Sequence, residues 1–241
     1  MPPAELDFRL DGCEAVNERV QEAFWRHIES DQDMLTVLAD HHTDGDQHSY
    51  YVLHNGAVTW GIPGDPQLVA LHLQRDTDRR AFRFEHAEMP LPAMAQSWLI
   101  ARGCPKDAIR LPPGMGTVPA DDATRALEER LMEEGDHFAL LTSYTDDDVA
   151  QSQTTVLLRA LDERTPMPFR IVLEEVDTDS RTHTLREGGF RTFEAATEWW
   201  DNRWAGEGVP LPTAPPPAPR RALSTASARP TPAAPPRGRA H

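Results

Sequence analysis

Residues 68–102 read LVALHLQRDTDRRAFRFEHAEMPLPAMAQSWLIAR, and residues 169–203, which lie 101 positions later, read FRIVLEEVDTDSRTHTLREGGFRTFEAATEWWDNR. The two stretches align without a gap, and four of their seven identities fall in one turn: Asp76, Thr77, Asp78 and Arg80 match Asp177, Thr178, Asp179 and Arg181. The other three identities pair Ala95, Trp98 and Arg102 with Ala196, Trp199 and Arg203. Similarity at a fixed period indicates that one supersecondary unit occurs twice in the chain.

Upstream of these stretches the two copies align with a shift of 103 residues. DMLTVLADHHTDG (residues 33–45) then overlies DHFALLTSYTDDD (residues 136–148). Ahead of each stretch, apolar residues at spacings of three and four predict an amphipathic helix. These residues are Val16, Val20, Ala23, Phe24 and Ile28 in the first copy, and Ala120, Ala123, Ala126, Leu127 and Leu131 in the second. The change in shift falls in the loops around GIPGDPQ and ERTPMPF, where changes of length are best tolerated.

The second copy gives the clearest prediction of strands. We expect them at HFALLTSY (137–144), SQTTVLLRA (152–160), PFRIVLEEV (168–176) and RTHTLRE (181–187), separated by turn residues in TDDD, ERTP and DTDS. Connections this short favour an antiparallel meander, because parallel neighbours need crossovers of about a dozen residues or more. A final helix should begin at Glu194, with Ala195, Trp199 and Trp200 on its buried side.

These patterns predict an α+β protein made of two tandem copies of a helix, a four-stranded antiparallel sheet and a second helix. The first copy is expected to span residues 1–107 and the second residues 108–209. Residues 210–241 hold ten prolines, five arginines and no acidic residue. A segment of this composition buries too little apolar surface to offset its conformational entropy, so we expect a disordered, basic tail.

Composition and charge favour a soluble, cytoplasmic protein. Hydrophobic residues make up 39% of the 241 residues, and no apolar run approaches the roughly 20 residues that cross a bilayer. The N-terminal stretch MPPAELDFRLDG lacks the apolar region of a secretory signal. Without the five tail arginines, 19 basic residues stand against 39 acidic ones, a formal charge of −20. Because such a field repels anionic lipid and nucleic acid, we expect no membrane binding and no direct nucleic-acid binding by this body.

The cysteines and the lysine content add two smaller expectations. Cys13 and Cys104 lie far apart and outside any CxxC spacing, so we expect reduced thiols rather than a zinc ribbon or a redox motif. Lys106 is the only lysine among 24 basic residues. Together with abundant alanine, proline and arginine, this bias indicates a high-GC bacterial source.

The nine residues DHHTDGDQH (40–48) hold three histidines and three aspartates. Zinc takes about four ligands in a tetrahedral array, and His41, His42, Asp44 and His48 could supply them. However, adjacent histidines in a strand point to opposite faces, and the EF-hand calcium pattern is absent. The second copy has SYTDDDVAQ (143–151) at this place, with no histidine. A solvated β-turn, in which Asp44, Gly45 and Asp46 supply the turn geometry, is the favoured interpretation, and a metal site is the alternative.

Two further features recur in both copies. The Asp-Thr-Asp turns (76–78 and 177–179) carry paired carboxylates, but hairpin geometry explains them, and Arg80 or Arg181 would neutralise the turn. Trp98 and Trp199 occupy the same position in the predicted final helices, as core anchors would. Trp200 and Trp204 have no aromatic counterpart in the first copy, so they either cover the other copy or present an aromatic surface to a partner.

Functional motifs with known chemistry are missing from the sequence. It contains no GxSxG, no GxxxxGK[ST], no GxGxxG after a strand and no HExxH. The leading hypothesis is therefore a non-catalytic protein-binding or adaptor protein with an acidic body and a flexible tail. Its expected partner is a protein, and a basic surface on that partner would complement the acidic body. DNA mimicry is a variant of it, although arginines interrupt the acidic runs in RDTDRR and RALEERLMEEG.

A second hypothesis comes from a different functional class. A metal-dependent hydrolase could use His41, His42, Asp44 and His48 to hold a divalent ion that activates a water molecule. Apart from that ion, no cofactor is expected. The oligomeric state does not follow from the sequence.

Overall fold

The computed structural model describes residues 6–61, 64–134, 137–147, 151–205 and 209–213. It is a mixed α+β structure with two five-stranded sheets. The first sheet holds the strands β1 (Glu14–Ala15), β2 (Leu35–His42), β3 (His48–Asn55), β4 (Leu68–Asp76) and β5 (Ala81–Met89), in the order β1-β5-β4-β3-β2. The second holds β6 (Val118–Pro119), β7 (Phe138–Asp147), β8 (Gln151–Ala160), β9 (Phe169–Asp177) and β10 (Thr182–Phe190), in the order β6-β10-β9-β8-β7.

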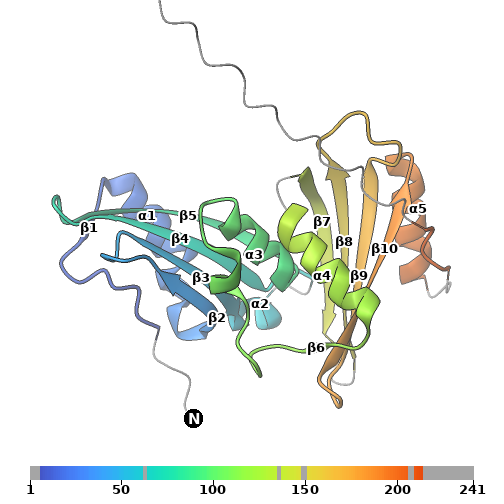
Figure 1. Cartoon of the computed structure of the whole chain (residues 1–241), viewed down its shortest axis with the longest axis horizontal. Helices are drawn as coiled ribbons and strands as arrows, with labels where there is room; N and C mark the ends of the chain where they lie inside the picture. The colour runs from blue at the N-terminus through green and yellow to red at the C-terminus, as the bar shows by residue number, and fades with distance from the viewer. Residues whose placement is uncertain (1–5, 62–63, 135–136, 148–150, 206–208, 214–241) are drawn as a thin grey trace, which may run out of the picture.

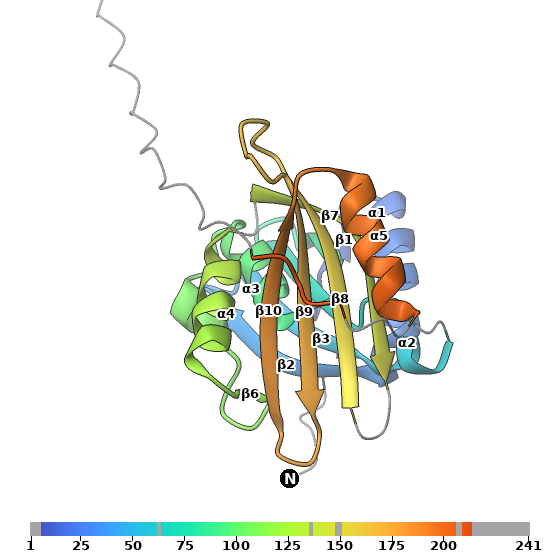
Figure 2. The same ribbon diagram turned by 90° about the vertical axis from the view of Figure 1, so that its right-hand side faces the viewer.

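Helices cover both faces of each sheet, as Figures 1 and 2 show. α1 (Glu18–His27) and α3 (Pro92–Ile100) pack on opposite faces of the first sheet, and α4 (Asp122–Glu134) and α5 (Phe193–Trp204) on opposite faces of the second. α3 and α4 lie side by side between the two sheets. Shorter elements are α2 (Gly56–Gly61) and the 3-10 helices Glu29–Met34 and Lys106–Ile109.

The four longer strands of each sheet form the antiparallel meander that the short connections predicted. The prediction of four strands per sheet is wrong by one strand. A two-residue strand ahead of the first helix of each half pairs in parallel with the last long strand, β1 with β5 and β6 with β10. Strands of two residues carry no alternating pattern, so the sequence offers no signal for them.

The two halves share the order of their strands and longer helices, to which the first half adds α2 and two 3-10 helices, and they share local irregularities. A bulge interrupts the pairing between Val37 and Ala39 in β2, and another lies between Leu140 and Thr142 in β7, 103 residues later. Arg80 and Arg181 both have a positive φ, 51° and 54°, in the turns that join β4 to β5 and β9 to β10. The two shifts that align the sequence therefore also align its backbone irregularities.

The paired arginines have a role other than neutralising their turns. Arg80 Nε donates to the carbonyl oxygen of Gly12 at 3.0 Å, and Arg181 Nη2 donates to that of Gly114 at 3.0 Å. Each arginine thus holds the segment that leads into a short parallel strand. The turn carboxylates accept backbone N–H groups, Asp76 from Arg79 and Asp177 from Asp179 and Ser180, as the structural interpretation predicted.

The amphipathic helices form, but their boundaries are shifted, and Ala123 and Ala126 of the predicted second face are exposed. Phe24 and Ile28 are fully buried under the first sheet, and Leu127 and Leu131 are buried under the second. Val16 and Ala120 precede their helices, and Val16 is 45% exposed, so both fall outside the predicted apolar faces. α5 begins at Phe193 after the cap Thr192, and Ala196 is buried rather than Ala195.

One hydrophobic cluster joins the two halves. It combines Leu91 and Ala93, at the start of α3, with Leu127, Leu131 and Met132 of α4 and with strand residues of the second sheet. This cluster crosses the predicted boundary between residues 107 and 108. Along the part of the chain that the structure covers, no helix is long and apolar enough to cross a membrane.

Candidate functional site

The residues of the predicted metal loop separate onto two faces of the first sheet. His42 faces α1, where its Nδ1 lies 2.6 Å from Ser49 Oγ and its Nε2 lies 3.0 Å from Asp40 Oδ2. His41 lies on the other face, stacked against Tyr50. Asp44 lies in the turn that follows β2, where Gly45 and Asp46 take a positive φ. Among the residues described, no group of three or more His, Cys, Asp or Glu side chains is placed to hold a metal ion.

His48 meets a histidine that the sequence reasoning missed. Its Nδ1 lies 3.0 Å from Nε2 of His72, and the His72 ring stacks on Tyr50 with centroids 4.5 Å apart. Tyr50 pairs with both His41 and His72 in the strand register. The rings of His41, Tyr50, His72 and His48 therefore form a stack across β2, β3 and β4, which we call the ring stack.

Burial shapes the chemistry of the ring stack. His72 is 2% exposed, and its Nδ1 is buried without a hydrogen-bond partner in the described structure. Burial, with a smaller contribution from His48, lowers the pKa of His72 to about 4. Such a histidine stays neutral near pH 7, so the contact with His48 is a hydrogen bond between rings.

The tryptophans divide between core and surface. Trp199 is 5% exposed in the core under α5, as its anchor role predicted, whereas Trp98 is half-buried beneath the guanidinium of Arg102, 3.4 Å from its ring centroid. Trp200 is partly buried and packs against the same core as Trp199. Trp204 is 37% exposed and meets Tyr144 edge to face. Of the two proposed partner-binding residues, Trp204 is the one that offers a surface.

Neither cysteine takes part in a disulfide, as predicted. Cys104 is buried beneath α3, and burial raises the pKa of its thiol to about 12. A thiol of this kind is a poor nucleophile near neutral pH.

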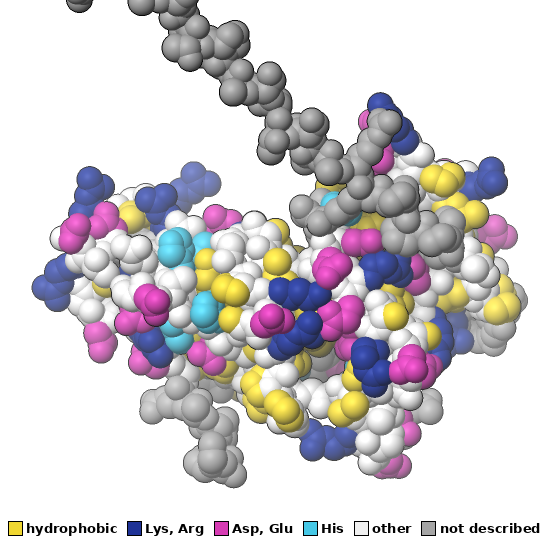
Figure 3. All heavy atoms as spheres, viewed as in Figure 1, with side chains coloured by type: hydrophobic (Ala, Val, Ile, Leu, Met, Phe, Trp, Pro, Cys, Tyr) yellow, Lys and Arg dark blue, Asp and Glu magenta, His cyan; other side chains and the backbone are white. Residues whose placement is uncertain are grey.

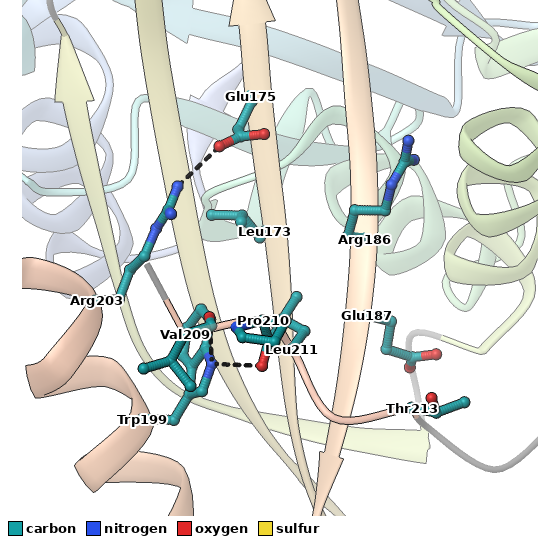
Figure 4. A pocket seen from close by; sticks show the side chains of 10 residues that line it. All are labelled: Leu173, Glu175, Arg186, Glu187, Trp199, Arg203, Val209, Pro210, Leu211 and Thr213. Atoms are coloured by element: carbon teal, nitrogen blue, oxygen red, sulfur yellow. Dashed lines mark hydrogen bonds and ion pairs between the residues drawn. The ribbon is translucent and has the colours of Figure 1, made fainter. Parts of the chain in front are cut away.

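A groove lies on the α5 face of the second sheet and is shown in Figure 4. Its volume is about 520 Å³, and its walls come from β9, β10, α5 and the segment that follows α5. That segment, Val209–Thr213, is named here the strap. Trp199 Nε1 donates to the carbonyl oxygens of Val209 at 3.2 Å and Pro210 at 3.3 Å (Figure 4).

The strap continues along the end of β10, beyond Thr182 and His183, which pair with β6. Gly189 N donates to the carbonyl oxygen of Pro212 at 3.3 Å, and Thr213 forms an isolated antiparallel bridge with Gly188. A Cβ atom at Gly188 would lie 2.7 Å from Leu211 Cδ2, so the absence of a side chain there makes room for the strap. The predicted tail boundary at Pro210 is therefore four residues too early, and the rest of the predicted tail lies outside the described residues.

Charged side chains frame the groove. Arg203 Nη2 lies 2.8 Å from Glu175 Oε1 on the rim (Figure 4). Deeper in the sheet, Glu187 pairs with Arg170 at 2.6 Å and with Arg130 at 2.5 Å. Arg170 is 3% exposed, so this second group is a buried ion-pair network beneath β10.

Comparison with known proteins assigns neither a family nor a function to the chain. No protein-family model matches the chain, and neither the curated proteins nor the solved structures give a match. The groove, the ring stack and the charge of the chain are therefore the features that bear on function.

Proposed function

We propose that this protein is a non-catalytic protein-binding or adaptor protein, and that the groove beside α5 receives an extended segment of its partner. The observation that carries the proposal is the strap, an extended segment that already lies in this groove. It is held mainly through its backbone carbonyls. Recognition of main-chain groups at a sheet edge tolerates varied side chains, which suits a groove that binds segments of other proteins.

The acidic body supports a partner with a basic surface. The body carries a formal charge of −20 without the five arginines beyond residue 213, and a field of this sign speeds the approach of basic partners. DNA mimicry has less support, because acidic and basic side chains are interspersed on the face seen in Figure 3. A mimic of phosphates would gain from an unbroken acidic face.

We infer that the two halves are copies of one α+β unit. The matched bulges, the matched positive-φ arginines and the shared element order support this inference. An adaptor built in this way presents two similar sheets joined through α3 and α4. Only the second of them carries a strap in the described structure.

The proposal is tested by capturing partners from the source cell with the full chain and two variants. Leu211→Asp weakens the packing of the strap and should raise capture of a groove-binding partner severalfold, since the strap competes for the groove. Gly188→Val places a side chain where Leu211 lies, so it fills the groove against a partner segment as well as against the strap. This variant should therefore reduce capture of the same partner. The readout is quantitative mass spectrometry of the captured proteins.

Leu161→Asp is the matched control for the first variant, because Leu161 is 59% exposed and lies outside the groove. Near-ultraviolet circular dichroism of the tryptophans confirms that each variant is folded. If the same proteins are captured in equal amounts by all four chains, the groove is not the binding site.

The metal-dependent hydrolase stays a separate prediction. Of its four predicted residues, His48 alone has another histidine within hydrogen-bond distance, and that histidine is His72. Elemental analysis of the purified protein, repeated with His48→Ala and His42→Ala, tests it. Less than a tenth of an equivalent of transition metal in the unmutated protein would rule it out.

A further inference from the structure

A second cavity lies at the junction of the two halves, on the α4 face of the second sheet. Its volume is about 280 Å³, and it opens between α3, α4, β6 and the connection from Leu111 to Thr117. It is separate from the strap groove, which lies on the α5 face. Its polar lining includes Gln96, Thr117, Glu128, Glu174 and His183. We call it the junction cavity.

Most charged groups around the junction cavity are already paired. Arg110 forms two hydrogen bonds with Glu129, at 2.6 and 3.1 Å, and Lys106 Nζ lies 2.9 Å from the same carboxylate. These cations lower the pKa of Glu129 to about 2, Arg110 first and Lys106 second. The Gln96 amide donates to the carbonyl oxygen of Ile109 at 2.8 Å. None of these groups is available to balance a further charge.

Glu174 and Glu128 remain without a cation of their own. The structure gives the Glu174 carboxyl no hydrogen bond and no ion pair with any described residue, although Glu174 follows the buried residue Val172 on the α4 face of β9. Glu128 Oε1 lies 3.0 Å from Nε2 of His183. Glu128 is thus paired with an imidazole that is charged only when protonated, and the Glu174 carboxyl has no ion-pair partner among the described residues.

His183 is buried at the wall of the junction cavity with unused hydrogen-bonding capacity. It is 4% exposed, and its Nδ1 lies 2.8 Å from Thr117 Oγ1. Its Nε2 is buried and makes no aligned hydrogen bond, although Glu128 is close. Burial lowers the pKa of His183, but the carboxylates of Glu128 and Glu174 outweigh burial and raise it.

A cation that donates N–H groups would complete this arrangement. Burial, with a smaller contribution from Glu128, raises the pKa of Glu174 to about 7, against the opposing effect of His183. An unpaired carboxylate in such surroundings is costly, and a bound cation would remove the cost. A cavity slightly below the roughly 300 to 1,000 Å³ of small-molecule sites suits a single side-chain-sized group.

We propose that the junction cavity binds a guanidinium group through Glu174 and Glu128. The planar guanidinium presents its N–H donors as a fork, which matches carboxylate acceptors better than a compact ammonium ion does. The group can come from an arginine side chain of a protein or from a free guanidinium compound. This proposal does not depend on the strap groove.

Calorimetric titration of the full chain with N-acetylarginine amide tests the proposal. At pH 8 we expect saturable binding at one site, and at pH 5.5 binding at least tenfold weaker. The pKa of Glu174, raised to about 7 mainly by burial, makes this carboxyl neutral at the lower pH, and acid also favours the charged form of His183, whose pKa is raised. Glu128, Glu129 and Arg110 are the other charged groups that line the cavity. N-acetylcitrulline amide, which has the same shape without the charge, should not bind.

Two variants locate the site, and one controls for general charge. Glu174→Gln and Glu128→Gln should each weaken binding at least tenfold, whereas Glu198→Gln, at an exposed position on α5, should not. As a second readout, the carboxyl carbon shift of Glu174 should titrate at lower pH when the probe is bound. A folded Glu174→Gln variant that binds the probe as well as the unmutated chain would overturn the proposal.

Two further ligands test where the bound guanidinium group comes from and whether the cavity prefers it to an ammonium group. A pentapeptide with a central arginine that binds at least as tightly as the amide identifies a protein side chain as the source, and exclusion of the peptide identifies a free compound. N-acetyllysine amide should bind more weakly. Equal binding of the lysine and arginine probes would contradict selection of a guanidinium.

Discussion

His72 is the residue whose surroundings most clearly predict a dependence of stability on pH. Its pKa in the folded protein is about 4, below the usual 6.5 of the unfolded chain, because burial disfavours the charged ring. The unfolded state therefore binds more protons as pH falls from 6.5 towards 4, and the stability present above pH 6.5 is progressively lost. The pKa difference sets an upper limit of about 3 to 4 kcal/mol on this effect, because each pKa unit corresponds to about 1.4 kcal/mol.

Urea unfolding between pH 7.5 and 4.5 measures this loss. His72→Phe keeps a ring in the stack and should flatten the dependence of the unfolding free energy on pH. His54→Gln serves as the control, because His54 lies on the neighbouring strand β3 outside the ring stack. If the His72→Phe and unmutated proteins lose stability in parallel on acidification, burial of His72 is not the cause.

Glu174 predicts a dependence of stability on pH that is opposite in sign to that of His72. Its carboxyl has a pKa raised to about 7 in the folded protein by burial, so folding opposes its ionisation above the usual pKa of 4.5. Stability contributed by the neutral form is present at low pH and lost as pH rises through 7. Glu174→Gln, which cannot ionise, should therefore raise the unfolding free energy at pH 8 by about 1 to 3 kcal/mol.

The same substitution should have little effect at pH 5, where the carboxyl is already neutral. Thermal melts of Glu174→Gln and of the control Glu198→Gln at the two pH values separate this effect from a general change of charge. A loss of stability at pH 8 would mean that the Glu174 carboxylate has a stabilising partner.

The strap determines which C-terminal truncations lower the stability of the protein. A chain that ends at Thr213 keeps the Leu211 packing, the Gly188 bridge and both acceptors of Trp199 Nε1. A chain that ends at Ala205 loses all three. We expect the unfolding free energy to fall by about 1 to 3 kcal/mol in the shorter chain, from lost apolar burial and hydrogen bonding.

Calorimetric melts compare the two truncations with the full chain. At roughly 2–4 °C per kcal/mol for a protein of this size, the chain ending at Ala205 should melt about 2 to 12 °C lower. The chain ending at Thr213 should melt within a degree of the full chain. Equal melting temperatures for both truncations would show that the strap contributes nothing to stability.

The hydrophobic cluster between α3, α4 and the second sheet packs residues of both halves together. Leu131 is 6% exposed in this cluster, together with Leu91 from the first half. Leu131→Ala removes buried methyl groups and leaves a cavity, which costs about 2 to 5 kcal/mol. Because both halves share the cluster, we expect the whole chain to unfold in one transition at a lower urea concentration.

Tryptophan fluorescence and far-ultraviolet circular dichroism should report the same midpoint for this transition. Leu161→Ala, at a position 59% exposed, is the control and should leave the midpoint nearly unchanged. Two separate transitions, of which only one moves in Leu131→Ala, would show that the halves fold independently.

Local patterns in the sequence predicted much of this architecture. The long strands of the second half were expected at 137–144, 152–160, 168–176 and 181–187, and they lie at 138–147, 151–160, 169–177 and 182–190. Alternating apolar residues and turn residues act over a few positions, so one sequence suffices to read them. The opposite orientations of His41 and His42 follow from the same strand period and are confirmed.

The candidate sites depended on contacts that no local pattern encodes. His72 meets His48 only because β3 and β4 pair in one particular register. Glu174 stands two residues after Val172, and this core spacing is the signal that could have placed it, partly buried, on the α4 face, but its neighbour His183 lies on another strand. The strap was assigned to the tail because its composition is rich in proline, and packing against Gly188 and Trp199 outweighed that composition.

The sequence by itself determined the α+β class, the antiparallel order of the long strands, the turn positions and the acidic charge, because each depends on residues close together or on composition alone. Tertiary structure alone decided the two-residue parallel strands, the cluster that joins the halves, the strap groove and the junction cavity. Each of these arises where segments separated by tens of residues bury surface together, and the free energy of that burial depends on which side chains meet in space.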